Sequence, residues 1–299
     1  MNALLLMLFS SAAMAQDLFR ASFDYAPPAG VQAENVSGDP TARFIAYDIG
    51  LLTPPIRVIP DRMLWINGVS FSQTNSQIFD AIGLNDEDGE VNLYSITLDM
   101  FFAASLNEKW SLLAAVIPGI HGNLVDGLSG QDFLMQGFIL ATVKLNERIA
   151  LGGGGGYANL FGVPQPLALV QFTYKGDRFS ADVLLPRNVD LWYEVVDESW
   201  FVGLQSEIAG GYYHIAPEQE NNPDNVFVQY SVGTFGPSLQ KAFGPLKLTA
   251  NVGWMGFRRY NVIQNDNPDP LFEFELDPAL NASISLTITP PLPNSTSAQ

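Results

Sequence analysis

The chain has 299 residues, of which 47% are hydrophobic and only 15% are charged, and it carries a net charge of −17 and no cysteine. The charged fraction lies well below the roughly 25% of soluble domains, which indicates a large surface that does not face water. The acidic balance argues against nucleic-acid binding, because contacts with phosphates need clustered Lys and Arg. The lack of cysteine excludes disulfide scaffolds and cysteine-based metal sites or nucleophiles.

The first predicted element is a cleaved signal peptide over residues 1–15. Leu4–Phe9 is a short apolar run, and Ala13–Ala15 has the small-x-small pattern of a cleavage site. The run is too short for a spanning helix, which needs about 20 apolar residues, and no longer apolar stretch follows it. We therefore expect export, a barrel domain over residues 16–290 and a disordered, Pro- and Ser-rich tail over residues 291–299.

Short segments in the rest of the chain alternate between apolar and polar residues. From Tyr94 to Phe102 every second residue is apolar, and the residues between them, such as Thr97 and Asp99, are polar. Because successive side chains of a strand point to opposite faces, each such segment is a two-faced β-strand. The same period occurs over residues 19–25, 179–185, 246–254 and 280–288.

Short and long connections alternate between these segments. Tight turns rich in Asn, Asp, Gly or Glu are predicted at Leu106–Lys109, Leu145–Arg148, Lys175–Arg178, Val196–Ser199 and Ala242–Pro245. Longer polar connections are predicted at Ser72–Glu90, Ile120–Gln131, Tyr212–Asn225 and Arg258–Pro270, with shorter ones near Asn159–Gln165 and Pro186–Asn188. Short turns on one rim and long loops on the other are the layout of outer-membrane barrels, whose long loops lie outside the cell.

Aromatic residues are expected at both rims, because amphipathic rings favour the two interfaces of a membrane. Those near the tight turns are Phe102, Trp110, Tyr174, Phe179 and Trp200, and those assigned to the long-loop ends are Tyr25, Tyr94, Tyr157, Tyr193, Tyr212, Tyr230 and Trp254. The sequence therefore predicts an all-β fold, a single transmembrane antiparallel up-and-down β-barrel. We expect about fourteen strands, with twelve or sixteen as alternatives, and short periplasmic turns with longer extracellular loops.

The polar face of the strands is expected to line the lumen. The inward set is mainly acidic or amide-bearing: Asp24, Asp48, Asp99, Gln136, Gln171, Asp182, Asp190, Glu194, Gln205, Glu207, Gln229 and Asn251. Fewer basic residues share this face, namely Arg20, Lys144 and Lys247. A water-filled lumen of this balance would concentrate cations, which predicts a narrow, passive, cation-preferring pore. The alternative is a packed lumen, and the inward apolar residues Phe138, Leu140 and Trp192 favour partial filling.

An acidic segment at Asn85–Glu90 is a candidate metal site. Asp86, Asp88 and Glu90 alternate and could offer oxygens to Ca²⁺, which could also bridge lipopolysaccharide phosphates. The position of the glycine and the lack of a Glu at the twelfth position do not match an EF-hand, so a solvated surface loop is the competing interpretation. No other cofactor is predicted.

The two histidines, His121 and His214, are the natural starting point for a catalytic site. Outer-membrane lipid hydrolases use a Ser close in sequence to the catalytic His, and no Ser follows either histidine within two positions. A distant Ser could still pair with either of them, and Asp126, Asp132 and Asp197 are isolated carboxylates for a peptide-acting enzyme. The competing interpretation places both histidines at the rim, exposed to solvent.

One block of the chain resembles a known family. The resemblance lies in Phe179–Pro186, Val189–Tyr193, Gly203–Leu204 and Gly210–Tyr213, which look like part of the bacterial outer-membrane barrels grouped as a domain of unknown function. The resemblance implies an outer-membrane location and brings no substrate or catalytic residue with it. The strand number also resembles the long-chain fatty-acid transporter barrels, but that family has an N-terminal plug, and here only Ala26–Pro40 separates the first two predicted strands.

The leading prediction is an exported outer-membrane barrel that acts as a narrow passive pore or as a structural surface protein. An outer-membrane enzyme acting on lipid or peptide is the first alternative, and a soluble secreted β-sandwich binding module is the second. The expected partners are outer-membrane lipid, lipopolysaccharide, the barrel-assembly machinery and an unidentified small solute.

Overall fold

The computed structural model describes residues 17–33, 41–60, 62–79, 90–125, 127–216, 226–264 and 267–289. The predicted signal peptide and C-terminal tail lie outside these ranges, as does Asp126. The described regular structure is β-strand apart from one 3₁₀ turn, η2 (Gly130–Asp132). Nowhere in these ranges is there a helix long and apolar enough to cross a membrane.

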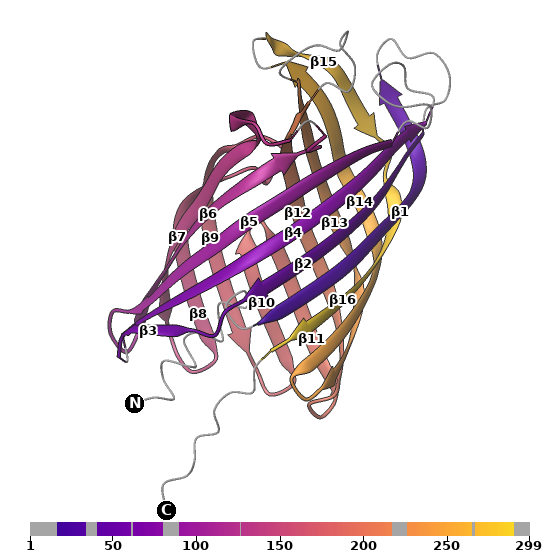
Figure 1. Cartoon of the computed structure of the whole chain (residues 1–299). Helices are drawn as coiled ribbons and strands as arrows, with labels where there is room; N and C mark the ends of the chain where they lie inside the picture. The colour runs from indigo at the N-terminus through magenta and orange to yellow at the C-terminus, as the bar shows by residue number, and fades with distance from the viewer. Residues whose placement is uncertain are drawn as a thin grey trace, which may run out of the picture.

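The strands form one antiparallel sheet that closes on itself (Figure 1). Fourteen strands make up the wall, and the circle closes through the pairings β1–β16, β16–β14 and β14–β13. The predicted barrel and its strand number are thereby confirmed, and the two-sheet sandwich is wrong. The wall strands are β1 (Phe19–Ala33), β2 (Thr41–Leu52), β4 (Met63–Phe79), β5 (Glu90–Ser105), β6 (Trp110–Gly122), β7 (Phe133–Lys144), β8 (Ile149–Ala158), β9 (Gln165–Lys175), β10 (Phe179–Leu185), β11 (Asn188–Val196), β12 (Trp200–Ile215), β13 (Val226–Phe243), β14 (Leu246–Gln264) and β16 (Ala279–Ile288).

Two further strands are attached to the wall. β3 (Ile56–Ile59) pairs with the beginning of β4, and β15 (Asn267–Leu276) lies between the ends of β14 and β1. All five predicted tight turns separate consecutive strands at one end of the barrel. We call this the short-turn end, and the opposite end, where β15 lies, the long-loop end (Figure 1).

The alternation read from the sequence corresponds to the two faces of the wall. Residues 19–25 pair one by one with both β2 and β16, so that Tyr25 points outward and Asp24 inward. The neighbouring outward residues Ile49 and Leu51 are 46% and 55% exposed. Apolar side chains on the outside of a closed sheet are what a hydrocarbon environment requires, because water would not tolerate so large an apolar band.

Aromatic side chains gather on the outside near the short-turn end. Trp65 and Phe102 stack with their ring centroids 5.8 Å apart, and the Lys241 Nζ lies 4.7 Å from the centroid of Trp200. Tyr193 pairs in register with Phe179 and therefore belongs to this belt, which corrects its assignment to the long-loop end. The error arose because the β10–β11 hairpin is much shorter than its neighbours.

The wall has very uneven height. β10 and β11 contain 7 and 9 residues, whereas β13 and β14 contain 18 and 19. The long strands rise above the short ones at the long-loop end (Figure 1). Several predicted long connections are therefore partly strand, and Arg258–Pro270 is almost wholly occupied by the end of β14 and the start of β15, which corrects that prediction.

Above the short strands the sheet closes a second time. Gly122 at the end of β6 pairs in parallel with His214 at the end of β12. This contact bypasses β7–β11 and completes a narrower circle of strands, which we call the upper ring, made of the long-loop ends of β6, β5, β4, β2, β1, β15, β14, β13 and β12. The part below it is the lower barrel.

The two faces of the sheet exchange character between these parts. In the lower barrel the outward residues are apolar, whereas the outward residues of the upper ring include Gln73, Asn75, Asn92 and Gln229. Most inward residues of the upper ring are apolar, and Leu93 and Val262 are each 1% exposed. The upper ring is therefore built like a small water-soluble barrel with an apolar interior.

The glycine run of β8 yields a test of this fold. A Cβ at inward-facing Gly154 would lie 2.0 Å from the Ile139 carbonyl oxygen, whereas a Cβ at Gly153 would meet nothing closer than the Leu169 oxygen at 3.9 Å. We expect Gly154→Ala to destabilise the barrel by about 1–3 kcal/mol, as overpacking does, and Gly153→Ala to leave it unchanged. The temperature at which the folded band disappears in heat-modifiable gel migration measures both, and equal temperatures for the two variants would contradict the register.

Candidate functional site

The lumen of the lower barrel collects the residues predicted to line it, with one exception. The strand registers place on this inner face Asp24, Asp48, Asp99, Gln136, Gln171, Asp182, Asp190, Glu194, Gln205, Glu207 and Asn251. Gln229 instead lies on the outside of the upper ring, opposite Tyr212 and Asn261. Its neighbours Val228 and Tyr230 take the inward positions, because the apolar face points inward at that level.

A ladder of side-chain hydrogen bonds crosses β11–β14 on the lumen wall. Gln205 Nε2 donates to Asp190 Oδ1 at 3.0 Å, and Ser238 Oγ donates to Gln205 Oε1 at 2.8 Å. Asn251 Nδ2 donates to Ser238 Oγ at 2.7 Å, and Asn188 Nδ2 donates to the second Asp190 oxygen at 2.7 Å. These bonds hold the polar side chains along the wall.

Carboxylates from several strands face one another in the lower lumen. Asp24 lies close enough to Asp48, Glu207 and Arg20 to interact electrostatically with all three. Asp182 lies directly opposite Asp190 in the β10–β11 register, and like charges in that position repel each other. A negatively charged wall of this kind attracts mobile cations.

Basic side chains offset part of this charge. Lys175 of β9 interacts electrostatically with Asp182, and Lys247 of β14 interacts with Lys175. Both lysines therefore lie near the Asp182 carboxylate. Arg187, at the tip of the β10–β11 hairpin, lies 4.0 Å from Glu207. The sequence pattern predicts Lys247 in the lumen but not Lys175, because Lys175 was assigned to the turn Lys175–Arg178, whereas it is the last residue of β9.

One side of the lower lumen is apolar. Ile66, Phe101 and Ala115 form a buried cluster, and Leu113 and Phe138 pack against it. The lower lumen is thus partly filled along β4–β7 and lined with polar groups along β9–β14 and along β1 and β2.

The upper ring is filled by the side chains of its own strands. Phe44 stacks on Tyr230 with ring centroids 5.3 Å apart, and its centroid lies 6.4 Å from that of Tyr260. Tyr260 is 2% exposed and packs on Phe274 as well. The complete cluster, which we call the upper core, comprises Ala26, Val31, Ala42, Phe44, Leu93, Tyr213, Val226, Val228, Val232, Met255, Tyr260, Val262, Phe274 and Leu276.

Both histidines are buried, which corrects their interpretation as exposed rim residues. His121 is 4% exposed, and its ring contacts Tyr213 edge-on at a centroid distance of 6.1 Å. Its Nε2 has no hydrogen-bond partner among the described residues. His121 therefore lies beneath the upper core, where the upper ring meets the lower lumen.

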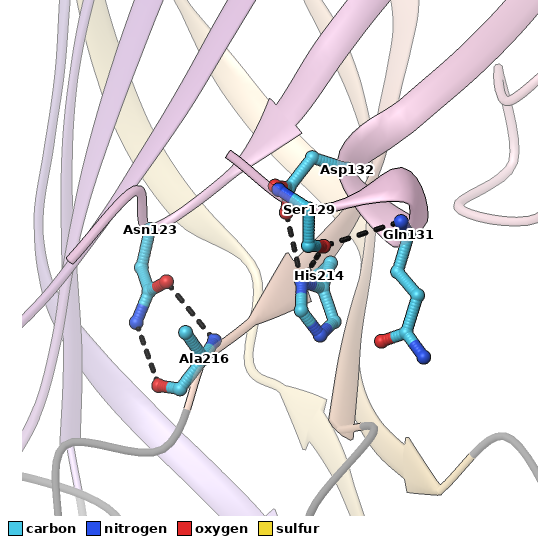
Figure 2. Close-up of polar contacts among 6 residues, drawn as sticks. All are labelled: Asn123, Ser129, Gln131, Asp132, His214 and Ala216. Atoms are coloured by element: carbon cyan, nitrogen blue, oxygen red, sulfur yellow. Dashed lines mark hydrogen bonds and ion pairs between the residues drawn. The ribbon is translucent and has the colours of Figure 1, made fainter. Parts of the chain in front are cut away.

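His214 belongs to a cluster that fastens β6 to β12 (Figure 2). His214 Nδ1 lies 2.7 Å from Asp132 Oδ1, and the two residues are 7% and 4% exposed. Asn123 and Ala216 exchange two hydrogen bonds of 3.1 and 3.0 Å, from the Asn123 side chain to the Ala216 backbone and back. A Cβ at Gly122 would lie 2.7 Å from the His214 carbonyl oxygen, so glycine is required for this approach. We call this cluster the β6–β12 junction.

Ser129, Asp132 and His214 are the residue types of a serine hydrolase, but their arrangement differs from one. Ser129 Oγ and Asp132 Oδ1 approach the same ring nitrogen, Nδ1, at 3.4 and 2.7 Å. In a hydrolytic triad the carboxylate holds one ring nitrogen and the serine faces the other. Asp132 also accepts a hydrogen bond from the Ser129 backbone N–H as part of a capping box around η2. The cluster therefore joins the β6–β7 connection to β12.

The other sites singled out from the sequence are not brought together. Asp197 lies in an exposed turn, 3.8 Å from Arg178. Asp86 and Asp88 are outside the described residues, and of Glu90 only the backbone, at the start of β5, is described. Among the described side chains no group of three or more His, Asp or Glu could hold a metal ion. The calcium site stays a prediction.

Comparisons with known proteins assign a family. The family model described as "Domain of unknown function (DUF6268)" matches residues 66–289. No curated protein matches the chain.

Several solved structures match this chain over most of its length at low sequence identity. A Pseudomonas aeruginosa FadL homologue is 13% identical, with 93% of this chain and 92% of that chain covered and a TM-score of 0.49. The Pseudomonas putida toluene transporter TodX is 11% identical, with coverages of 96% and 93% and a TM-score of 0.39. The translocator domain of the autotransporter NalP from Neisseria meningitidis has 11% identity, the same coverages and a TM-score of 0.40. Such similarities assign neither a substrate nor a mechanism to the chain.

The β6–β12 junction gives a second test. Asp132→Ala removes the acceptor for both His214 and the Ser129 backbone, and leaving buried donors without an acceptor costs about 1–3 kcal/mol. We expect faster amide hydrogen exchange at the ends of β6 and β12, with the lower barrel unchanged. Asp197→Ala removes an exposed carboxylate and is the matched control. Unchanged exchange at residues 212–216 in Asp132→Ala would show that the junction does not depend on this pair.

Proposed function

Because the chain belongs to the DUF6268 family, a domain of unknown function, we propose a role from its own geometry: an outer-membrane barrel that is a narrow, passive, cation-preferring pore and rests in a closed state. The observation that carries this proposal is the apolar upper core lying directly above an acidic lumen.

The location follows from the exchange of faces along the barrel axis. The apolar outside of the lower barrel matches hydrocarbon, and the polar outside of the upper ring matches water or the sugar and phosphate layer of lipopolysaccharide. This orientation puts the short turns in the periplasm and the upper ring outside the cell. A cleaved signal peptide over residues 1–15 and insertion by the barrel-assembly machinery are the matching route of export.

Closure is the role of the upper core in this proposal. A dry constriction lined by apolar side chains prevents ion flow because ions cannot shed their water there. Tyr260, Phe44 and Tyr230 occupy the centre of the ring, so passage requires them to move. The β6–β12 junction keeps the ring narrow, since its loss would let the circle widen toward the full wall.

Cation preference is the role of the acidic wall. Asp182 and Asp190 lie side by side, and Asp24, Asp48 and Glu207 interact nearby, whereas Lys175 and Arg187 neutralise only part of this charge. Cations are therefore enriched in the lumen beneath the closure.

A mainly structural surface protein is the second candidate. The filled upper ring favours it, because a permanently packed core would leave the barrel without conductance. The two candidates differ in whether current appears when the core is loosened.

Loosening the core is therefore the decisive variant. Tyr260→Ala removes a side chain that is 2% exposed and should cost about 3–5 kcal/mol of packing. We expect purified wild-type protein in planar bilayers to be closed most of the time, and Tyr260→Ala to show frequent openings. Trp254→Ala, on the outer face of the same strand, is the control and should behave like the wild type. A silent Tyr260→Ala barrel that still migrates as folded would favour the structural role.

Ion preference is tested in the same open variant. Replacing both Asp182 and Asp190 by Asn removes two negative charges from the lumen wall without changing side-chain size. The reversal potential in a salt gradient should then shift toward zero, because the enrichment of cations falls. Glu198→Gln, in an exposed turn at the short-turn end, is the control. An anion preference in the parent variant would defeat this part of the proposal.

A further inference from the structure

A single guanidinium group lies inside the upper ring, next to the upper core. Arg258 is 2% exposed, and its central carbon lies 5.0 Å from the centroid of the Phe44 ring. Nη1 donates to the Asp277 backbone oxygen at 2.8 Å, but Nε and Nη2 have no hydrogen-bond partner among the described residues. The Asp277 carboxylate itself accepts a hydrogen bond from Gln32.

A buried charge with two unused donors is unfavourable. Each unsatisfied donor costs its lost hydration, and the penalty is larger for an ionised group. None of the ion pairs formed by described residues includes Arg258. The stacking on Phe44 offsets part of the cost as a cation–π contact, but it leaves the in-plane N–H groups unused.

The two unused nitrogens lie on the same edge of the guanidinium. Nε and Nη2 point their N–H bonds in parallel along this edge, while Nη1 is committed on the other side. Two parallel donors at this spacing match the two oxygens of a carboxylate, which is the bidentate geometry in which Arg binds most strongly.

The backbone is distorted immediately before Arg258, and the distortion aims the residue inward. The β13–β14 register shifts at Gly256, and Phe257 adopts a φ of +50° and is 88% exposed. A positive φ is rare for a bulky residue and tends to occur at functional sites. Without the bulge Arg258 would follow the outward parity of Trp254, and Arg259 would point inward in its place.

From this geometry we propose that Arg258 is the anchor of a binding site for a small monocarboxylate with a compact apolar body. The carboxylate binds the free Nε–Nη2 edge, and the apolar part takes a place among the rings of Phe44, Tyr230 and Tyr260, which move apart to admit it because they fill the ring. A single negative charge suits the site, because the described part of the upper core offers it one guanidinium group, whose charge the nearby Asp277 carboxylate already offsets in part. A doubly charged phosphate would leave one charge uncompensated among apolar groups.

Benzoate is a suitable probe, because it combines one carboxylate with one ring. The full chain, folded in detergent, is titrated with benzoate by calorimetry, and saturable binding of one equivalent is expected. Benzyl alcohol, which keeps the ring and lacks the charge, should bind at least about tenfold more weakly. Inorganic phosphate should give no saturable heat, and tighter binding of phosphate than of benzoate would overturn the assigned ligand class.

Two neighbouring arginines supply matched variants. Arg258→Gln should weaken benzoate binding at least about tenfold, and Arg258→Lys should also weaken it because an ammonium lacks the planar fork. Arg259→Gln removes an exposed arginine one position away and should bind like the wild type. Heat-modifiable migration verifies that each variant is folded, and benzoate should raise the unfolding temperature of the wild type and of Arg259→Gln but not of Arg258→Gln.

The binding measurements test the carboxylate site without any measurement of ion current. Absence of saturable benzoate binding to folded wild-type protein would overturn it, as would equal affinities for Arg258→Gln and the wild type. Water alone would then satisfy the guanidinium. The inference goes beyond the proposed pore, since a barrel that never conducts can still bind a carboxylate, and a pore can open without doing so.

Discussion

The structure depends on one constraint, which is that the backbone N–H and C=O groups of a strand need hydrogen-bond partners, and that a strand edge without a neighbour leaves a row of them unpaired. A closed sheet meets it, but strands of 7 and 19 residues in one wall leave long strands without neighbours above short ones. β6 and β12 respond by pairing with each other over the gap, and η2 and the Asn123–Ala216 bonds complete the contact. The upper ring exists because of this second closure.

Two environments on one strand explain the division of roles. In the proposed membrane orientation, strands such as β4 and β13 pass from hydrocarbon into water, and their apolar face changes from outside to inside along the same strand. The lower barrel can then keep a polar, acidic interior, while the upper ring must fill its interior with apolar side chains. In the proposed pore, the side chains of the wall itself therefore close the lumen.

The regular parts of this fold were readable in the sequence, and the irregular parts were not. Period-two alternation predicted the strands, the tight turns and the inward direction of Asp182 and Asp190. The alternation gave the wrong face for Gln229. It assumes that apolar residues face outward, whereas the apolar Val228 and Tyr230 face inward in the upper ring and leave Gln229 on the outside. It also ended β14 too early, since the bulge at Gly256–Phe257 shifts the parity of Arg258. Asp132 and His214 are 82 positions apart in the sequence, so no local sequence pattern predicts their contact.

In the proposed membrane location, the low wall at β10–β11 also affects the lipid around the protein. A strand needs about 9–11 residues to cross a bilayer, and β10 has 7, while β13 on the far side of β12 has 18. The apolar girdle is therefore shorter on one flank than on the other. A membrane accommodates such hydrophobic mismatch by local thinning or by tilt of the barrel. The lipid bordering Phe179–Leu185 would be the thinnest part of the annulus, and the tilt of the barrel axis would be directed by that flank.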